Sequence, residues 1–74
     1  MINVTFMGLR RTTDVVDENT TIKKALEDKS MDYANSLITL DGYQLNATEL
    51  NSTFAEMGIR ESCHLASTTR KDNA

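Results

Sequence analysis

A regular alternation of apolar and polar side chains opens the chain. The run Ile-Asn-Val-Thr-Phe has the period of a half-buried strand and predicts a first strand over residues 1–7. Gly8 can supply the turn that follows. Residues 12–17 are rich in β-branched side chains and predict a second strand. Its phase stays open, because Val15 and Val16 are adjacent: one of them points away from the core, or a bulge shifts the alternation.

A short amphipathic helix is predicted over residues 22–29. Ile22, Ala25 and Leu26 fall three or four residues apart, so they share one face of a helix, while charged side chains cover the opposite face. Thr21 comes directly before the first apolar position and is the expected N-cap. A helix of two or three turns depends on tertiary packing, and we therefore expect this face to lie on the sheet.

A strand, a tight turn and a short continuation are predicted in the middle of the chain. Residues 36–40 are mainly apolar or β-branched, and Asp41-Gly42 follows them directly. An Asp-Gly pair between apolar runs is a strong turn signal, because glycine accepts positive φ without steric cost. The continuation ends at Leu45.

The last third of the chain contains one more predicted strand. Residues 46–52 are polar, and residues 53–59 have the pattern of a single helical or 3₁₀ turn closed by Gly58. Residues 63–66 predict the final strand, with alternate side chains facing the core. Residues 68–74 are polar and are expected to form a flexible tail. The predicted domain therefore covers residues 1–67.

Composition narrows the possible functions. The 74 residues suffice for one small domain, and 39% hydrophobic with 26% charged residues is ordinary for a globular protein. The net charge of −3 and the scattered basic residues argue against a nucleic-acid partner. The start of the chain has neither a signal-peptide pattern nor a long apolar run, so we expect a cytoplasmic protein that does not enter a membrane.

Candidate chemistry is sparse. Cys63 is the only cysteine, which excludes an intrachain disulfide and a cysteine-based metal site. His64 is its neighbour, but adjacent side chains in a strand point to opposite faces and cannot easily act as a nucleophile and its base. Acidic residues are numerous but lack the spacing of a calcium loop. The sequence therefore predicts no enzyme, with no catalytic, cofactor-binding or metal-binding residue.

The order of predicted elements resembles the β-grasp fold of the ubiquitin-like superfamily over about residues 1–67. The first strand begins at the start of the chain, and the helix begins at Thr21-Ile22 after an acidic connector. Gly42-Tyr43-Gln44-Leu45 is similar to the Gly-Lys-Gln-Leu turn of ubiquitin, and residues 53–65 are similar to its closing segment. The resemblance implies an α+β fold, with a mixed four-stranded sheet packed on one short helix.

Comparison with the ubiquitin-like modifiers also indicates how the function of this chain differs from theirs. Ubiquitin-like modifiers and the small sulfur carriers of thiamine and molybdopterin synthesis act through a C-terminal Gly-Gly, which this sequence does not contain. We therefore expect a non-enzymatic protein-interaction module, and the Asn- and Thr-rich turns suggest a bacterial source. The alternative is a degenerate sulfur carrier or modifier that docks on an activating enzyme without being conjugated.

A protein partner is expected to bind the sheet face or an edge strand. The resemblance implies that Thr39 takes the exposed third-strand position of ubiquitin's recognition patch. The second strand has little in its composition to block pairing. We expect a monomer, or a weak homodimer formed through an edge strand. The candidate partner-binding residues are Leu9, Arg10, Arg11, Thr39, Tyr43 and His64.

Overall fold

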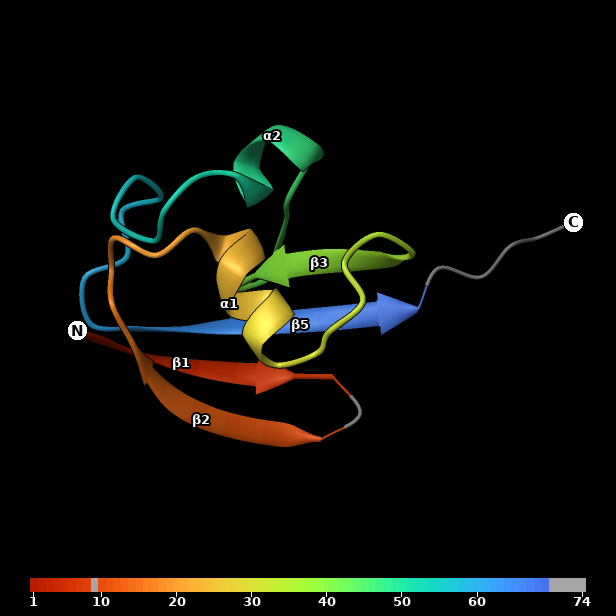
Figure 1. Ribbon diagram of the computed structural model, residues 1–74, viewed down its shortest axis with the longest axis horizontal. Coiled ribbons are helices and arrows are strands. Elements are labelled where there is room, and N and C mark those ends of the chain that lie inside the picture. The colour runs from red at the N-terminus through yellow and green to blue at the C-terminus, as the bar shows by residue number, and fades with distance from the viewer. Residues whose placement is uncertain (9, 70–74) are drawn as a thin grey trace, which may run out of the picture.

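A five-stranded sheet with one helix against its inner face forms the body of the protein (Figure 1). The computed structural model describes residues 1–8 and 10–69. In chain order its elements are β1 (Ile2–Met7), β2 (Arg11–Val16), α1 (Ile22–Asp28), β3 (Ser36–Leu40), β4 (Tyr43–Gln44), α2 (Ala47–Leu50) and β5 (Ser62–Thr69).

The strands follow the order β2-β1-β5-β3-β4 across the sheet. β1 and β5 run parallel, and the other neighbouring pairs are antiparallel, so the sheet is mixed. The predicted α+β architecture is confirmed, but the sheet has five strands where the sequence pattern gave four. The difference is β4, whose two residues were expected only as a continuation after the turn. They pair with Thr39 and Leu40 of β3 and form a strand of their own.

The turn between β3 and β4 is also tied to β5. Asp41 and Gly42 have φ values of 51° and 87°, which explains the need for an Asp-Gly pair. The backbone amide of Asp41 donates to the His64 carbonyl at 2.8 Å. The backbone amide of His64 in turn donates to the Asp41 carboxylate at 2.8 Å. The turn therefore fixes the end of β3 near the start of β5.

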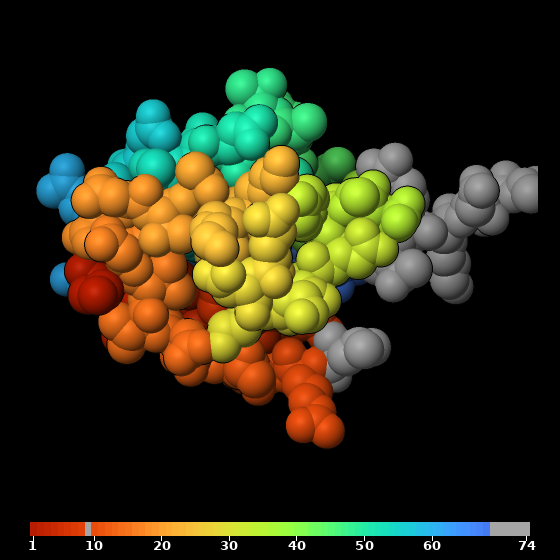
Figure 2. Space-filling model, in the orientation of Figure 1, coloured from red at the N-terminus to blue at the C-terminus, as the bar shows by residue number. Residues whose placement is uncertain are grey.

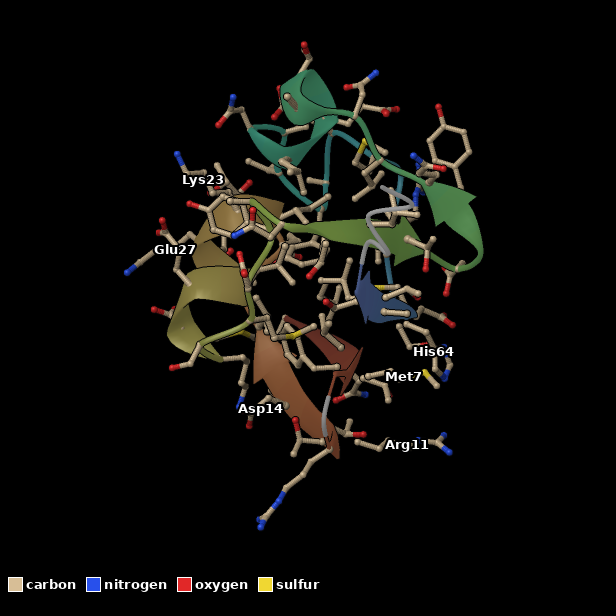
Figure 3. The ribbon with its side chains drawn as sticks, turned by 90° about the vertical axis from the view of Figure 1, so that its right-hand side faces the viewer. Met7, Arg11, Asp14, Lys23, Glu27 and His64 are labelled. Atoms are coloured by element: carbon tan, nitrogen blue, oxygen red, sulfur yellow. The ribbon has the colours of Figure 1, made fainter. Side chains whose placement is uncertain are left out.

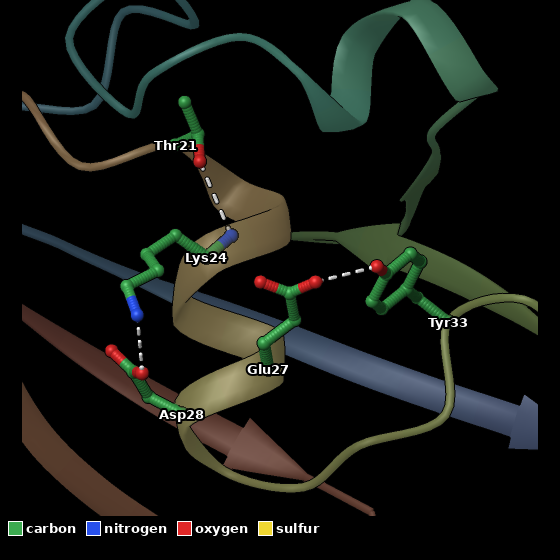
Figure 4. A network of polar contacts seen from close by, with 5 residues as sticks. All are labelled: Thr21, Lys24, Glu27, Asp28 and Tyr33. Atoms are coloured by element: carbon green, nitrogen blue, oxygen red, sulfur yellow. Dashed lines mark hydrogen bonds and ion pairs between the residues drawn. The ribbon is translucent and has the colours of Figure 1, made fainter.

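Helix α1 begins as the sequence predicted (Figure 4). The Thr21 hydroxyl accepts a hydrogen bond from the backbone amide of Lys24 at 3.2 Å, which caps the helix. On the exposed side Lys24 pairs with Asp28 at 3.1 Å, one turn further along. The Tyr33 hydroxyl donates to the Glu27 carboxylate at 2.8 Å and ties the segment after the helix back onto it.

The core lies between α1 and the inner face of β1, β5 and β3. Val16 points inward and packs against this core, whereas Val15 points outward and is 61% exposed. The regular six-pair register between β1 and β2 settles the phase without a bulge. The buried hydrophobic residues of the core are Ile2, Val4, Phe6, Ile22, Ala25, Leu26, Ile38, Leu40, Leu45, Phe54, Cys63 and Leu65.

Two features of the last third of the chain differ from the prediction. Helix α2 forms within residues 46–52, because Asn46 and Glu49 cap each other's backbone amides at 2.8 and 2.9 Å. β5 extends to Thr69, beyond the predicted end at residue 66, because its outer half pairs with β3. The first two residues of the predicted tail thus belong to the sheet, and residues 70–74 lie outside the described residues.

Candidate protein-binding surface

The outer face of the sheet carries a cross-strand row of side chains that α1 does not cover. Met7 of β1 lies opposite Arg11 of β2 on one side and Ala66 of β5 on the other. Ala66 in turn lies opposite Thr39 of β3, which completes the row. Directly opposed residues in a sheet point to the same face. Met7 is 39% exposed and supplies the large apolar side chain of this row.

A second cross-strand row on the same face is polar, and two of its side chains are hydrogen-bonded to each other. Thr5 lies between Thr13 of β2 and His64 of β5. The hydroxyl groups of Thr5 and Thr13 are 3.1 Å apart, and Thr5 is only 8% exposed although it faces outward. His64 Nδ1 lies 3.6 Å from the Asp41 carboxylate, so the imidazole is held beside the β3–β4 turn.

Figure 3 shows how the two faces of the sheet differ. Met7, Arg11 and His64 project from β1, β2 and β5 to one side, while Asp14 and Glu27 lie on the side of α1. We call the outward group the outer patch. It consists of Met7, Arg11, Thr39, His64 and Ala66.

The outer patch unites three of the six residues predicted from the sequence: Arg11, Thr39 and His64. Tyr43 is 58% exposed, but it pairs with Leu40 and therefore shares the register of the inner face. The nearby Glu49 carboxylate raises the pKa of Tyr43. Arg10 is exposed in the turn before β2, and Leu9 lies outside the described residues.

Met7 and Ala66 complete the patch but were absent from the predicted set. Their signal was present in the alternation, because Met7 follows the buried Phe6 and Ala66 follows the buried Leu65. Such alternation places a residue on a face, but only the parallel register of β1 and β5 brings these two side chains together. That register links distant parts of the chain and has no local signal.

The neighbouring Cys63 and His64 point to opposite faces, as the strand period predicted. Cys63 is buried in the core, and burial, followed by the charge of Asp41, raises the pKa of its thiol to about 11. A thiol that stays protonated at neutral pH is a poor nucleophile. Among residues 1–8 and 10–69, no three His, Cys, Asp or Glu side chains gather in a way that could hold a metal ion.

The inner side of β2 borders a groove beside α1 (Figure 2). In this view α1 and the segment after it cover the centre, and β2 runs along the lower margin. The groove has a volume of about 360 Å³, and Asp14 and Val16 of β2 line it together with Ala25 of α1. Lys29 crosses between the two elements, pairing with Asp14 and lying 5.5 Å from the centre of the Phe6 ring.

A second groove continues past Lys29 toward the start of β2. It has a volume of about 730 Å³, with Phe6 and Met31 as its apolar lining and Arg10 and Thr12 on its β2 side. The helix therefore covers β1 but leaves the inner side of β2 open along most of its length.

Neither helix in the described part of the chain has the length and apolar character to span a bilayer.

The fold has close counterparts among solved structures. The ubiquitin of Caldiarchaeum subterraneum superposes with a TM-score of 0.67 over 99% of this chain and 98% of its own length, at 16% sequence identity. A ubiquitin-like protein of the same hyperthermophilic archaeon superposes with a TM-score of 0.59 over 97% of this chain and all of its own length, at 18% identity.

These likenesses show that the chain has the ubiquitin-like β-grasp fold, as the order of its sequence elements indicated. At such low identity they establish the fold alone. No family model and no curated protein matches the sequence.

Proposed function

We propose that this chain is a non-enzymatic protein-interaction module that binds a protein partner through the outer patch. The observation that carries the proposal is the exposed Met7 beside Arg11 on a sheet face that neither helix of the described residues covers. Methionine and arginine are enriched at protein interfaces, since a flexible apolar chain and a planar cation adapt to many partner surfaces. Small neighbours at Thr39 and Ala66 leave room around Met7 for a partner's side chain.

The chemistry of the patch suggests the chemistry of its partner. An apolar side chain would pack on Met7 and Ala66, and a carboxylate would pair with Arg11. The acidic net charge of the chain favours a protein over a nucleic acid as the partner. The cytoplasmic location and the bacterial source stay predictions, and the two solved structures named above are archaeal.

A photo-crosslinking amino acid at position 7 tests this proposal in an extract of the source organism. We expect one dominant adduct that excess unlabelled wild-type protein suppresses and that an added Ala66→Lys substitution abolishes. The matched control carries the crosslinker at position 24 of α1, on the opposite side of the molecule, and is expected to give no such adduct. Equal adducts from both positions, or none that wild-type protein suppresses, would contradict the proposal.

Docking on an activating enzyme without conjugation is the second candidate. It draws on the same fold, and the sequence has three glycines, of which no two are adjacent. The crosslinking experiment separates the candidates, because an activating enzyme would be identified directly as the captured protein.

A further inference from the structure

Strand β2 is an open edge of the sheet. Within residues 1–8 and 10–69 it is the end member of the strand order and pairs with β1 alone. Natural proteins usually protect such edges with proline, lysine, a bulge or a very short strand. β2 has neither proline nor lysine nor a bulge; it is six residues long, regular in register, and exposed at every position except the half-buried Val16, and its charged side chains are Arg11 and the inward-facing Asp14. Its outward backbone groups are therefore available to another strand.

The side chains of β2 are complementary to a second copy of β2 in one antiparallel register. A two-fold axis perpendicular to the sheet must pass midway between a residue and its own copy, because directly opposed side chains share a face. With Thr13 on the axis, Arg11 lies opposite Val15 of the copy, and Thr12 lies opposite Asp14. Each of these contacts occurs twice.

The contacts in this register are favourable on both faces. On the outer face the aliphatic stem of Arg11 covers the exposed Val15 of the copy. On the inner face the Thr12 hydroxyl can donate to the carboxylate of Asp14. Thr13 meets its own copy as it already meets Thr5 within the sheet, where the hydroxyl oxygens lie 3.1 Å apart.

The neighbouring register is unfavourable. With Asp14 on the axis, two carboxylates oppose each other directly, and like charges in that position are destabilising. Arg11 would then leave Val15 uncovered. The register centred on Thr13 pairs residues 11–15 of both copies without opposing two like charges, whereas a register centred on Thr12 would pair only residues 11–13 of the strand.

We propose that a second copy of this chain is the occupant of the β2 edge, paired antiparallel about Thr13. The two sheets then join into one, with both outer patches on the same side. This inference does not rest on the proposed partner of the outer patch. A single strand pair buries little surface, so the dimer is expected to be weak and to form with rising protein concentration.

Charge substitutions at Val15 test the register by sedimentation equilibrium at low ionic strength. Val15 is exposed and lies opposite the neutral Asn3 within its own sheet, so both a lysine and a glutamate are tolerated there. In the dimer each new side chain faces Arg11 of the copy, twice. Val15→Glu should tighten the dimer roughly fivefold and Val15→Lys should weaken it by a similar factor. Combining Arg11→Glu with Val15→Lys should restore dimerisation.

Three results would overturn the proposal. Wild-type protein that stays monomeric up to its solubility limit would show that β2 does not pair with a second copy of this chain. A dimer whose dissociation constant is unchanged by all these substitutions must form through a surface other than β2. Equal effects of glutamate and lysine at position 15 would exclude the register centred on Thr13. Oxidative crosslinking of Thr13→Cys gives an independent measurement, with Val15→Cys as its control, because only position 13 meets its own copy.

Discussion

The two strands of the first hairpin have equal length, but one is mostly buried and the other mostly exposed. β1 buries four of its six residues, whereas β2 has five exposed residues and one half-buried. Both contain threonine and valine, so intrinsic strand propensity does not distinguish them. The difference is position: β1 lies between β2 and β5 under α1, and β2 has a neighbour on one side only.

This contrast extends to the inner face of the hairpin. Val4 and Phe6 are fully buried, while their β2 partners Asp14 and Thr12 are polar and line open grooves. β1 is therefore a structural strand whose side chains hold the core. β2 depends on its ladder with β1, on Val16 and on the Lys29–Asp14 contact, which leaves its remaining surface free for interactions.

The largest expected effect separates the two strands energetically. Phe6→Ala should lower the free energy of unfolding by about 3–5 kcal/mol, because it removes a buried ring and leaves a cavity. The matched change Thr12→Ala, directly across the hairpin, should alter it by no more than about 0.5 kcal/mol, because the side chain is exposed. Urea unfolding measures both. Similar losses for the two variants would show that β2 also supports the core.

A smaller effect concerns the contact that joins the start of β1 to the connector after β2. The terminal ammonium group of Met1 lies 2.9 Å from the Glu18 carboxylate and donates a hydrogen bond to it, which lowers the pKa of Glu18 below its ordinary value of 4.5. A carboxyl whose pKa is lower in the folded state stabilises the protein above its unfolded-state pKa. That contribution disappears as the pH falls through the folded-state pKa.

Glu18→Gln should therefore be less stable than wild type at neutral pH, and the gap should close below pH 4.5 as Glu18 becomes protonated. Thermal unfolding across this pH range measures the gap. Glu61→Gln removes the same charge from an exposed position and serves as the control. A gap that persists unchanged in acid would attribute the loss to something other than the ionised carboxylate.

The sequence predicted what depends on short-range pattern. Helix α1, its cap at Thr21 and the Asp41-Gly42 turn each have a local physical cause, and they appear where expected. β4 and the phase of β2 depended on the register with the preceding strand of each hairpin, which alternation alone does not determine. α2 had a local signal, the reciprocal capping of Asn46 and Glu49, that the polar composition of its segment concealed.

The candidate surface was predictable only in part. Thr39 followed from the resemblance to ubiquitin, His64 from strand alternation, and Arg11 from its charge at the tip of the first hairpin. Ala66 and Met7 required the parallel pairing of β5 with β1, which joins the two ends of the domain. Tyr43 was assigned to the surface correctly, but its pairing with Leu40 and its contact with Glu49 separate it from the outer patch.

Amide hydrogen exchange along β2, at low and at high protein concentration, tests most directly whether this strand is an open edge that pairs with itself. In an antiparallel pair only alternate residues of each strand bond to the partner. At low concentration, alternate amides of residues 11–16 should be protected by β1 and the others should exchange fast. At high concentration the fast set should become protected. Two results would contradict this account: uniform protection of all β2 amides in dilute solution, or fast-exchanging amides whose exchange rates do not fall at high protein concentration.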